Sequence, residues 1–348
     1  MTRRETSSAS YESVTDLALL TLPSANRVYG RDLGRLAQAE IAAVAPALHG
    51  ALRAQQVRAI GGVEYIVLTI DGFDDHDRFV LSNLSAAYAL FVLTDGDTSL
   101  RPLDMQPLAF FDSDLITMQR YSGKTNEQFT HLLVNVAVAV SAAAHERRAQ
   151  GLAVRLFDPL AGRGTTLNRG LMYGFDVAGV DLDPGDFEAY RTFLTTYLKD
   201  NRLSPTVERA AIRKGTLAGA KRCTMTIRRS QHLDVVNDDT VRADQHFSAR
   251  SFDVLVGDLP YGIHHGSTSS GNLARSPADL VQAALPGWRG LLRRGAGLAL
   301  AWNLKTFPRG DFEDMLRAAG FDVMADAESF DHRVDRSITR GIVLATTR

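Results

Sequence analysis

The sequence predicts two domains: a small α+β domain, followed by a larger α/β domain built on a mostly parallel sheet. Between residues 12 and 115, strand-like runs are mixed with one helical pattern, whereas from Leu152 onward apolar strands alternate with helical stretches. Such alternation is typical of a parallel sheet with helices on both faces. We expect a disordered tail at 1–11, the first domain at 12–118 and the second domain at 119–348.

The elements of the first domain follow from the spacing of its apolar residues. Apolar and β-branched runs predict strands at 17–22, 65–70 and 88–93, and helical spacing predicts a helix at 33–44. The Ala/Val/Leu-rich stretch 127–144 is interpreted as one buried helix that precedes the α/β core.

The second domain is expected to contain five strands separated by helices. The strands are 154–157, 177–180, 235–236, 252–256 and 297–302, and the helices are 186–198, 277–292 and 311–319. Two strand-like pieces flank residues 335–337 within 332–347, which predicts a closing hairpin or an antiparallel edge.

Composition favours a soluble, cytoplasmic globular protein. The 348 residues are 45% hydrophobic and 23% charged, and no run approaches the ~18 apolar residues of a membrane-spanning helix. The first residues, MTRRETSSASYES, lack the apolar core of a secretory signal. The single cysteine, Cys223, excludes an internal disulfide framework and a Cys-rich zinc site, and we expect no metal.

Basic residues are concentrated in one stretch although the net charge is only −1. Residues 191–230 contain ten Lys or Arg against two acids, and the part at 199–229 is interpreted as an insertion. Segregated positive charge is typical of a surface that contacts a polyanion. A solvated helix followed by a loop is the alternative. The candidates for contact with substrate in this stretch are Lys221 and Arg222.

The first strand of the second domain runs into DPLAGRGTT, residues 158–166. Gly162 and Gly164 permit a tight turn and close approach to a ligand, and a helix starting near Thr165 would direct its N–H groups at that ligand. Asp181 ends the second strand, where a carboxylate is placed to bind two ribose hydroxyls. The pattern indicates a nucleotide-like cofactor.

Two details favour S-adenosylmethionine over NAD. The third glycine of the dinucleotide-binding pattern is replaced by Leu167. Asp158, which ends the first strand, would repel a pyrophosphate but attract the ammonium and sulfonium groups of S-adenosylmethionine. Farther along, Asp238 and Asp239 follow the third strand. Asp238 could bind the adenine amino group, or it could cap a helix.

The run DLPYG, residues 258–262, follows the fourth strand at the same edge of the sheet. Asp258 and the Leu259 carbonyl can accept hydrogen bonds from an exocyclic N–H. Pro260 fixes the turn, and Tyr261 offers a face for stacking on a planar base. Orientation of the amine would supply the rate, since no strong base is needed at the start.

Together, DPLAGRGTT and DLPYG resemble motifs of the class I S-adenosylmethionine-dependent amino-methyltransferases, whose fourth motif is (D/N/S)PP(Y/F). The nearer likeness is to the tRNA guanosine N2-methyltransferase group that usually carries an amino-terminal THUMP domain. The segment HRVDRSITRGIVLAT, residues 332–346, resembles that group's closing hairpin. The resemblance covers roughly 120–348 and implies a Rossmann-like fold with a seven-stranded, mostly parallel sheet; Leu259 in place of the first proline and the short front domain depart from it.

By the same resemblance, YSGKTNEQF at 121–129 lies where the family covers the methionine end of the cofactor, so Lys124, Thr125 and Asn126 are candidates; a helix start capped by Thr125 is the alternative. The full cofactor-binding set is Asp158, Pro159, Gly162, Gly164, Thr165, Asp181, Leu182, Asp238, Asp239 and Asn126. The catalytic set is Asp258, Pro260 and Tyr261, and the substrate-binding set is Leu259, Gly262, His264, Lys221 and Arg222.

The expected function is methylation of an exocyclic base amine, with guanosine N2 in tRNA favoured and a nucleic acid as partner. DNA adenine-N6 methylation is a second possibility. A small molecule or a protein amide is a third possible substrate, and a non-catalytic RNA-binding protein is the fourth interpretation. The sequence leaves open the modified position, the number of methyl groups and the oligomeric state.

Overall fold

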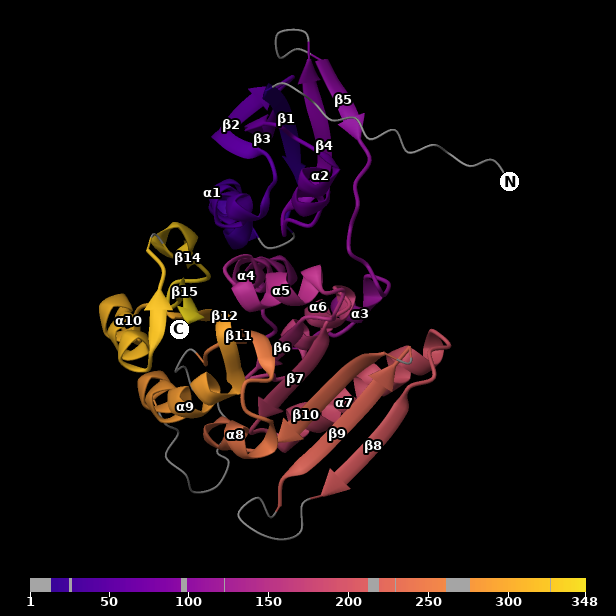
Figure 1. Ribbon diagram of the computed structural model, residues 1–348, viewed down its shortest axis with the longest axis vertical. Coiled ribbons are helices and arrows are strands. Elements are labelled where there is room, and N and C mark those ends of the chain that lie inside the picture. Colours follow the sequence, from indigo (N-terminus) through magenta and orange to yellow (C-terminus); the bar gives the residue numbers. More distant parts are fainter. Residues whose placement is uncertain are drawn as a thin grey trace. The chain divides into compact units, whose positions relative to one another are not determined.

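The computed structural model describes residues 14–24, 27–94, 99–121, 123–211, 219–228, 230–260, 276–325 and 327–348. The chain divides into two compact units, 1–108 and 109–348 (Figure 1). This boundary lies before the expected one at 118/119. The linking residues belong with the second unit because the Phe110 amide donates to the Met172 carbonyl oxygen and the Phe111 ring packs on Tyr197.

The first unit is a five-stranded antiparallel sheet with two helices. Its elements are β1 (Val14–Thr21), α1 (Arg27–Val44), η1 (Ala45–Ala47), β2 (Ala51–Ile60), β3 (Val63–Asp71), α2 (Asp75–Ser82), β4 (Ala87–Thr94) and β5 (Ser99–Leu103). The strand order is β2-β3-β1-β4-β5, and every neighbouring pair is antiparallel. The three strands and the helix expected here are all present, whereas β2, β5 and α2 were not anticipated.

The second unit carries the remaining elements. They are α3 (Asp114–Thr117), α4 (Glu127–Ala139), α5 (Ala142–Ala149), β6 (Arg155–Asp158), α6 (Thr165–Met172), β7 (Asp176–Asp181), α7 (Pro184–Asp200), β8 (Thr206–Ala211), β9 (Lys221–Ile227), β10 (Gln231–Asn237), η2 (Thr240–Arg242), α8 (Ala243–His246), β11 (Phe252–Asp258), α9 (Pro277–Leu291), β12 (Leu292–Asn303), α10 (Arg309–Ala318), β13 (Phe321–Val323), η3 (Ala327–Phe330), β14 (His332–Arg333) and β15 (Thr339–Thr347).

These strands form one mixed sheet with a parallel centre. The order is β13-β15-β12-β11-β6-β7-β10-β9-β8, with β14 paired to β15. The five strands β12, β11, β6, β7 and β10 are mutually parallel, and β15 runs antiparallel to β12. Figure 1 shows β6, β7, β10 and β11 side by side, with β9 and β8 continuing the sheet. The sheet is therefore of the mixed α/β, mostly parallel kind that the sequence predicts.

The expected count of seven strands is wrong for the described residues, where this sheet has ten strands. Two additions, β8 and β9, come from the basic stretch, which was interpreted as an insertion that contacts a polyanion, with a solvated helix and loop as the alternative. They pair antiparallel and extend the sheet beyond β10. Alternation explains β9, because Cys223, Met225 and Ile227 are buried between more exposed residues.

The single helix expected at 127–144 is two helices, α4 and α5. The break lies at Ser141, whose hydroxyl oxygen accepts a hydrogen bond from the Ala144 amide (3.0 Å) and donates to the Asp253 carbonyl oxygen (2.7 Å). Serine is a favoured helix N-cap, and this local bond competes with continuation of the helix. The apolar pattern was identified correctly, but the cap within it was missed.

The apolar core of the second unit lies between the sheet and its helices. Residues from β6, β7, β11, β12 and β15 pack against α9 and α10, with Trp288 and Trp302 among the fully buried side chains. This packing fixes the carboxyl ends of β6 and β11 next to each other. No helix among the described residues is long and apolar enough to cross a membrane.

Candidate active site

The candidate site lies where the sheet changes its winding direction. From β6 the strand order runs through β7 and β10 on one side and through β11 and β12 on the other. In open α/β sheets, ligands bind outside the carboxyl ends of the strands at such a switch point. Asp158, Asp181 and Asp258 end β6, β7 and β11 respectively. Three sequence-selected carboxylates thus meet at one edge.

A cavity of about 240 Å³ opens between the two motifs. It is lined by Tyr121, Gly123, Thr125, Thr130, Leu133, Asp158, Leu160, Ala161, Gly162, Arg163, Thr165, Thr166, Asp186 and Asp258. The structure therefore brings the glycine loop and Asp258 to a common space. Asp181 lies beside this cavity rather than in its lining, and contacts the glycine loop directly.

The glycine loop is held by Asp181. The Gly162 amide donates to Asp181 Oδ2 (2.6 Å), and the Asp183 amide donates to Oδ1 (2.8 Å). Gly162 and Gly164 have φ angles of 50° and 79°, the left-handed region that favours glycine. Gly164 immediately precedes α6, so the first amides of this helix face the cavity rim.

Burial raises the pKa of two carboxyl groups at this edge of the sheet. Asp158 is 2% exposed, and burial raises the pKa of its carboxyl to about 7, helped by the nearby charges of Asp181 and Asp258. Burial likewise raises the pKa of Asp181 to about 6, against the opposing hydrogen bonds from the Asp183 and Gly162 amides. A cavity with clustered, desolvated carboxylates favours a cationic ligand over an anionic one.

These shifts predict that stability without ligand falls as pH rises from 5.5 to 8. A raised folded-state pKa means that the folded chain binds protons that the unfolded chain, with a pKa near 3.8, has already lost. The stabilisation that these bound protons give the folded chain is fully present below the unfolded pKa of 3.8. It is lost as pH rises through the folded-state pKa of Asp181, about 6, and then that of Asp158, about 7. We expect a loss of about 2 kcal/mol from Asp158. Thermal unfolding of the second unit, followed across this pH range, measures it.

Asp158→Asn is the matched variant for this pH dependence. Its side chain has nearly the same size but cannot titrate, so its unfolding temperature should vary less with pH and exceed that of the unaltered chain at pH 8. Parallel pH profiles for the two proteins would show that Asp158 is not the group responsible.

Asp258 is held by residues from two other parts of the chain. Thr125 Oγ1 donates to Asp258 Oδ2 (2.8 Å), and Arg340 Nη2 approaches the same oxygen (3.4 Å). The Arg340 guanidinium lies over the Phe129 ring, with its carbon 4.2 Å from the ring centroid. Thr125 lines the cavity, whereas Arg340 is not among the described lining residues.

The helix start near Thr125 has a different cap from the expected one. Asn126, a cofactor candidate, is the N-cap of α4, and its Oδ1 accepts the Phe129 amide (3.0 Å). Thr125 was the expected cap but contacts Asp258 instead. Lys124 Nζ donates to the carbonyl oxygens of Ile116 and Gln119, which ties it into the preceding turn.

The third-strand acids divide their roles. Asp239 Oδ1 accepts the Val241 amide (3.0 Å) and caps η2. Asp238 is buried; it contacts Arg242, and its Oδ2 lies 2.6 Å from His246 Nε2. The cap alternative therefore applies to Asp239, whereas the Asp238 carboxylate is already engaged by basic side chains.

The other sequence candidates lie in three places. Leu182 follows β7 and is 70% exposed, the most exposed large apolar side chain at this edge. Pro159 is buried next to Gly257. Leu259 is buried with its amide bonded to the Ala301 carbonyl oxygen (2.8 Å), and Pro260 is exposed. Tyr261, Gly262 and His264 lie outside the described residues.

The two basic candidates lie on β9, away from the cavity. Arg222 is ion-paired with Asp234 and lies over Phe247. Lys221 Nζ is 3.6 Å from Glu188 Oε1. The structure does not bring either residue to the cavity that contains Asp258.

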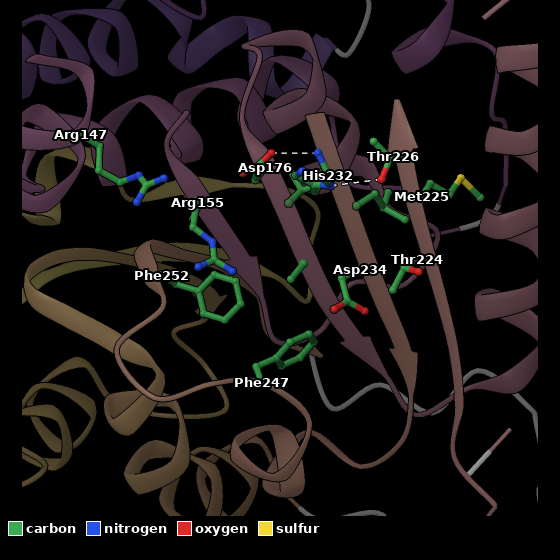
Figure 2. Close-up of a pocket in the computed structure, with 13 residues that line it drawn as sticks. Arg147, Arg155, Asp176, Thr224, Met225, Thr226, His232, Asp234, Phe247 and Phe252 are labelled. Carbon is green, nitrogen blue, oxygen red and sulfur yellow. Dashed lines mark hydrogen bonds between the residues drawn. The ribbon is translucent and has the colours of Figure 1, made fainter. Parts of the chain in front are cut away.

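A second cavity of about 400 Å³ lies on the face of β7, β9 and β10 (Figure 2). Asp176, which begins β7, lines it, so it is at the opposite edge from the three carboxylates. Its lining carries two arginines, Arg147 and Arg155, and two aspartates, Asp176 and Asp234, so its charge is balanced. None of the sequence-selected site residues lines this cavity, and its balanced charge identifies no ligand class.

Comparisons with known proteins give a likeness of fold only. No protein-family model and no curated protein matches the chain. TrmN from Thermus thermophilus is 15% identical, with 84% of this chain and 59% of that chain covered and a TM-score of 0.41. A TehB-like SAM-dependent methyltransferase from Corynebacterium glutamicum is 17% identical, with 64% and 97% covered and a TM-score of 0.35.

A third similar structure is a 1,6-didemethyltoxoflavin-N1-methyltransferase from Burkholderia thailandensis, solved with S-adenosylhomocysteine. It is 16% identical, with 60% of this chain and 77% of that chain covered and a TM-score of 0.33. This chain thus spans 59% of the length of TrmN and larger shares of the other two.

Arg340 is the residue in contact with Asp258 that sequence reasoning missed. It lies at the start of β15, opposite Asn303 at the end of β12. Because β15 runs antiparallel to β12, its first residues fall at the carboxyl edge, where the ligand crevice lies. The expected closing hairpin is present as β14 and β15, so this direction could have indicated Arg340.

Proposed function

We propose that the protein is an S-adenosylmethionine-dependent methyltransferase that acts on an exocyclic amine of a nucleic-acid base. The observation that carries this proposal is the shared cavity lined by Asp158 and Gly162 from one motif and by Asp258 from the other. One motif suits a nucleoside cofactor with positive charge, and the other suits a hydrogen-bond-donating acceptor. Because both motifs line one cavity, a bound cofactor and an acceptor amine would lie next to each other there.

The residues beside the glycine loop fit this cofactor. The desolvated Asp158 favours the ammonium and sulfonium charges, whereas a pyrophosphate would be repelled. Asp181 accepts two backbone N–H groups, but a carboxylate offers about four acceptor positions and retains capacity for ribose hydroxyls. Exposed Leu182 would contact the adenine. When bound, the cofactor would supply an electrophilic methyl group.

Asp258 would orient the amine. Its carboxylate accepts a hydrogen bond from the amine N–H, which directs the nitrogen lone pair into the cavity. The new N–C bond would form as the methyl–sulfur bond breaks, and the amine proton becomes acidic only then. Asp258 would therefore stabilise the developing positive charge and accept the proton afterwards rather than abstract it beforehand. The chain's contribution is orientation and electrostatics.

A nucleic-acid acceptor, guanosine N2 in tRNA, is the substrate we favour. Lys199, Arg202 and Arg209 are exposed at the end of α7 and on β8, which leaves part of the basic stretch available to phosphates. DNA adenine N6 is the second candidate because Asp258 would accept from an adenine amine equally well. A base within a folded arm or duplex would have to be extruded to reach the cavity.

Labelled methyl transfer identifies the acceptor. The full chain is incubated with methyl-labelled S-adenosylmethionine and, separately, unmodified tRNA transcripts, double-stranded DNA and a mixture of small amines. The polymers are then digested to nucleosides for mass spectrometry. We expect label in N2-methylguanosine from tRNA. Label in N6-methyladenine from DNA would select the alternative, and absence of label from every acceptor would contradict the proposed activity.

A further inference from the structure

The carboxylate of Asp258 has a built support that the motif itself does not contain. Thr125 and Arg340 converge on its Oδ2 from the segment before α4 and from β15. We propose that Arg340 and Thr125 are positioning residues that hold Asp258 as a hydrogen-bond acceptor toward the cavity. This inference rests on the proposed function and restricts its methyl acceptors to groups that can donate a hydrogen bond to Asp258, of which the proposed base amine is one.

The burial of Arg340 indicates a specific role. Arg340 is 5% exposed and lies over the Phe129 ring, so its charge is largely removed from water. A buried cation costs several kcal/mol unless a carboxylate and good geometry compensate. Its ion pair with Asp258 joins residues 82 positions apart in the chain. A neutral side chain could fill this buried position without the desolvation penalty of a charge, so packing alone does not explain an arginine here.

Thr125 supplies a directional hydrogen bond to Asp258 in addition to the charge of Arg340. Its hydroxyl donates to Oδ2 at 2.8 Å, and the Asn126 cap immediately after it fixes the backbone from which this hydroxyl projects. A guanidinium and a hydroxyl at one carboxylate oxygen restrict rotation about the side-chain bond of Asp258. Both Thr125 and Asp258 line the cavity, so the held carboxylate faces the place where an acceptor would enter.

This support has a consequence for substrate class. A carboxylate that already receives two donors on one oxygen acts as an acceptor, and it offers no hydrogen to a carbonyl or to a ring nitrogen that lacks one. A substrate group that can only accept hydrogen bonds would lose its hydrating water beside Asp258 without gaining a hydrogen-bond donor in return. As methyl acceptors, amines and amides with an N–H are therefore favoured over carbonyl oxygens and ring nitrogens that carry no hydrogen and have no hydroxyl group beside them.

Steady-state kinetics of four variants of the full chain test this inference, with unmodified tRNA transcripts as the probe. We expect kcat to fall roughly 10–100-fold in Arg340→Gln and in Thr125→Val because the carboxylate loses its orientation. Arg340→Lys and Thr125→Ser should each recover part of the loss, since the charge or the hydroxyl is retained. The dissociation constant for S-adenosylhomocysteine, measured by calorimetry, should stay within about threefold in the two Arg340 variants, because Arg340 is not one of the described residues that line the cavity.

Arg309→Gln is the matched control. Arg309 is also largely buried, lies over Trp302 at 5.1 Å and is paired with Asp331, but it does not contact Asp258. Its removal should lower stability without the selective loss of kcat. Equal effects of the Arg309 and Arg340 substitutions on kcat would overturn the inference.

A double-mutant cycle separates this inference from the proposed function. In urea unfolding, Arg340→Gln should shift the midpoint by less than half as much in an Asp258→Ala background as in the unaltered chain, because its partner is already absent. Additive shifts would overturn the pairing whether or not tRNA is methylated. Failure of the unaltered chain to methylate any probe would instead refute the proposed function and leave the pairing to be judged by this cycle.

Discussion

Asp258→Ala should reduce methyl transfer by at least ~10²-fold while leaving cofactor affinity nearly unchanged. Under the proposed function, the removed carboxylate would orient the acceptor amine and stabilise the charge that develops on it, whereas the cofactor would be held mainly from the β6 and β7 side. Single-turnover rates with labelled cofactor measure the transfer, and calorimetry with S-adenosylhomocysteine measures the affinity. The substitution also leaves Arg340 without this carboxylate, so the folded fraction must be established by circular dichroism.

Asp181→Ala is the complementary control for that experiment. Asp181 holds the Gly162 amide and would bind ribose, so its loss should weaken S-adenosylhomocysteine by at least about tenfold. Transfer at saturating cofactor should be much less affected. If the Asp258 and Asp181 variants lost affinity and rate in the same proportion, the division of roles between the two motifs would be wrong.

Gly164→Ala is expected to have the largest effect on stability. Gly164 has φ of 79°, and an added Cβ would lie 2.2 Å from the Tyr190 ring. That ring is fully buried, and its hydroxyl donates to Asn168 Oδ1, so it has little room to move. Left-handed strain and overpacking together predict a loss of about 2–5 kcal/mol, or roughly 5–15 °C in the unfolding temperature.

Gly162→Ala is the control within the same loop. Gly162 also has a positive φ, 50°, but an added Cβ would meet no atom within 4 Å. Only the strain should remain, at about 1–2 kcal/mol. Calorimetric unfolding of both variants distinguishes the two contributions; a Gly162 variant as unstable as the Gly164 variant would show that contact with Tyr190 is not the cause.

Site residues that follow directly after a predicted strand could be placed from the sequence, whereas Arg340, which depends on strand alignment, could not. Asp158, Gly162 and Asp258 could be placed because each follows an apolar strand, and parallel strands end at one edge. Arg340 could not be placed with the same ease, since its contact with Asp258 depends on how the closing strand is aligned against β12. Long-range register is set by packing rather than by local pattern.

The errors in the fold have local causes. Ser141 interrupts an otherwise continuous helical pattern because its hydroxyl finds both a helix amide and the Asp253 carbonyl oxygen. Strands β8 and β9 were missed because charged residues such as Arg209 and Arg222 obscure their alternation. Arg222 tolerates its place in a strand because Asp234 on the neighbouring strand neutralises it.

The position of β15 has a consequence for the order in which the chain assembles. This strand enters the sheet between β12 and β13, although it is formed by residues 339–347, after both of its neighbours. The short β13 pairs with β15 in the described sheet, so it cannot join the sheet before β15 arrives. Because β15 also brings Arg340 to Asp258, the contacts that hold Asp258 are complete only after this last strand has joined the sheet.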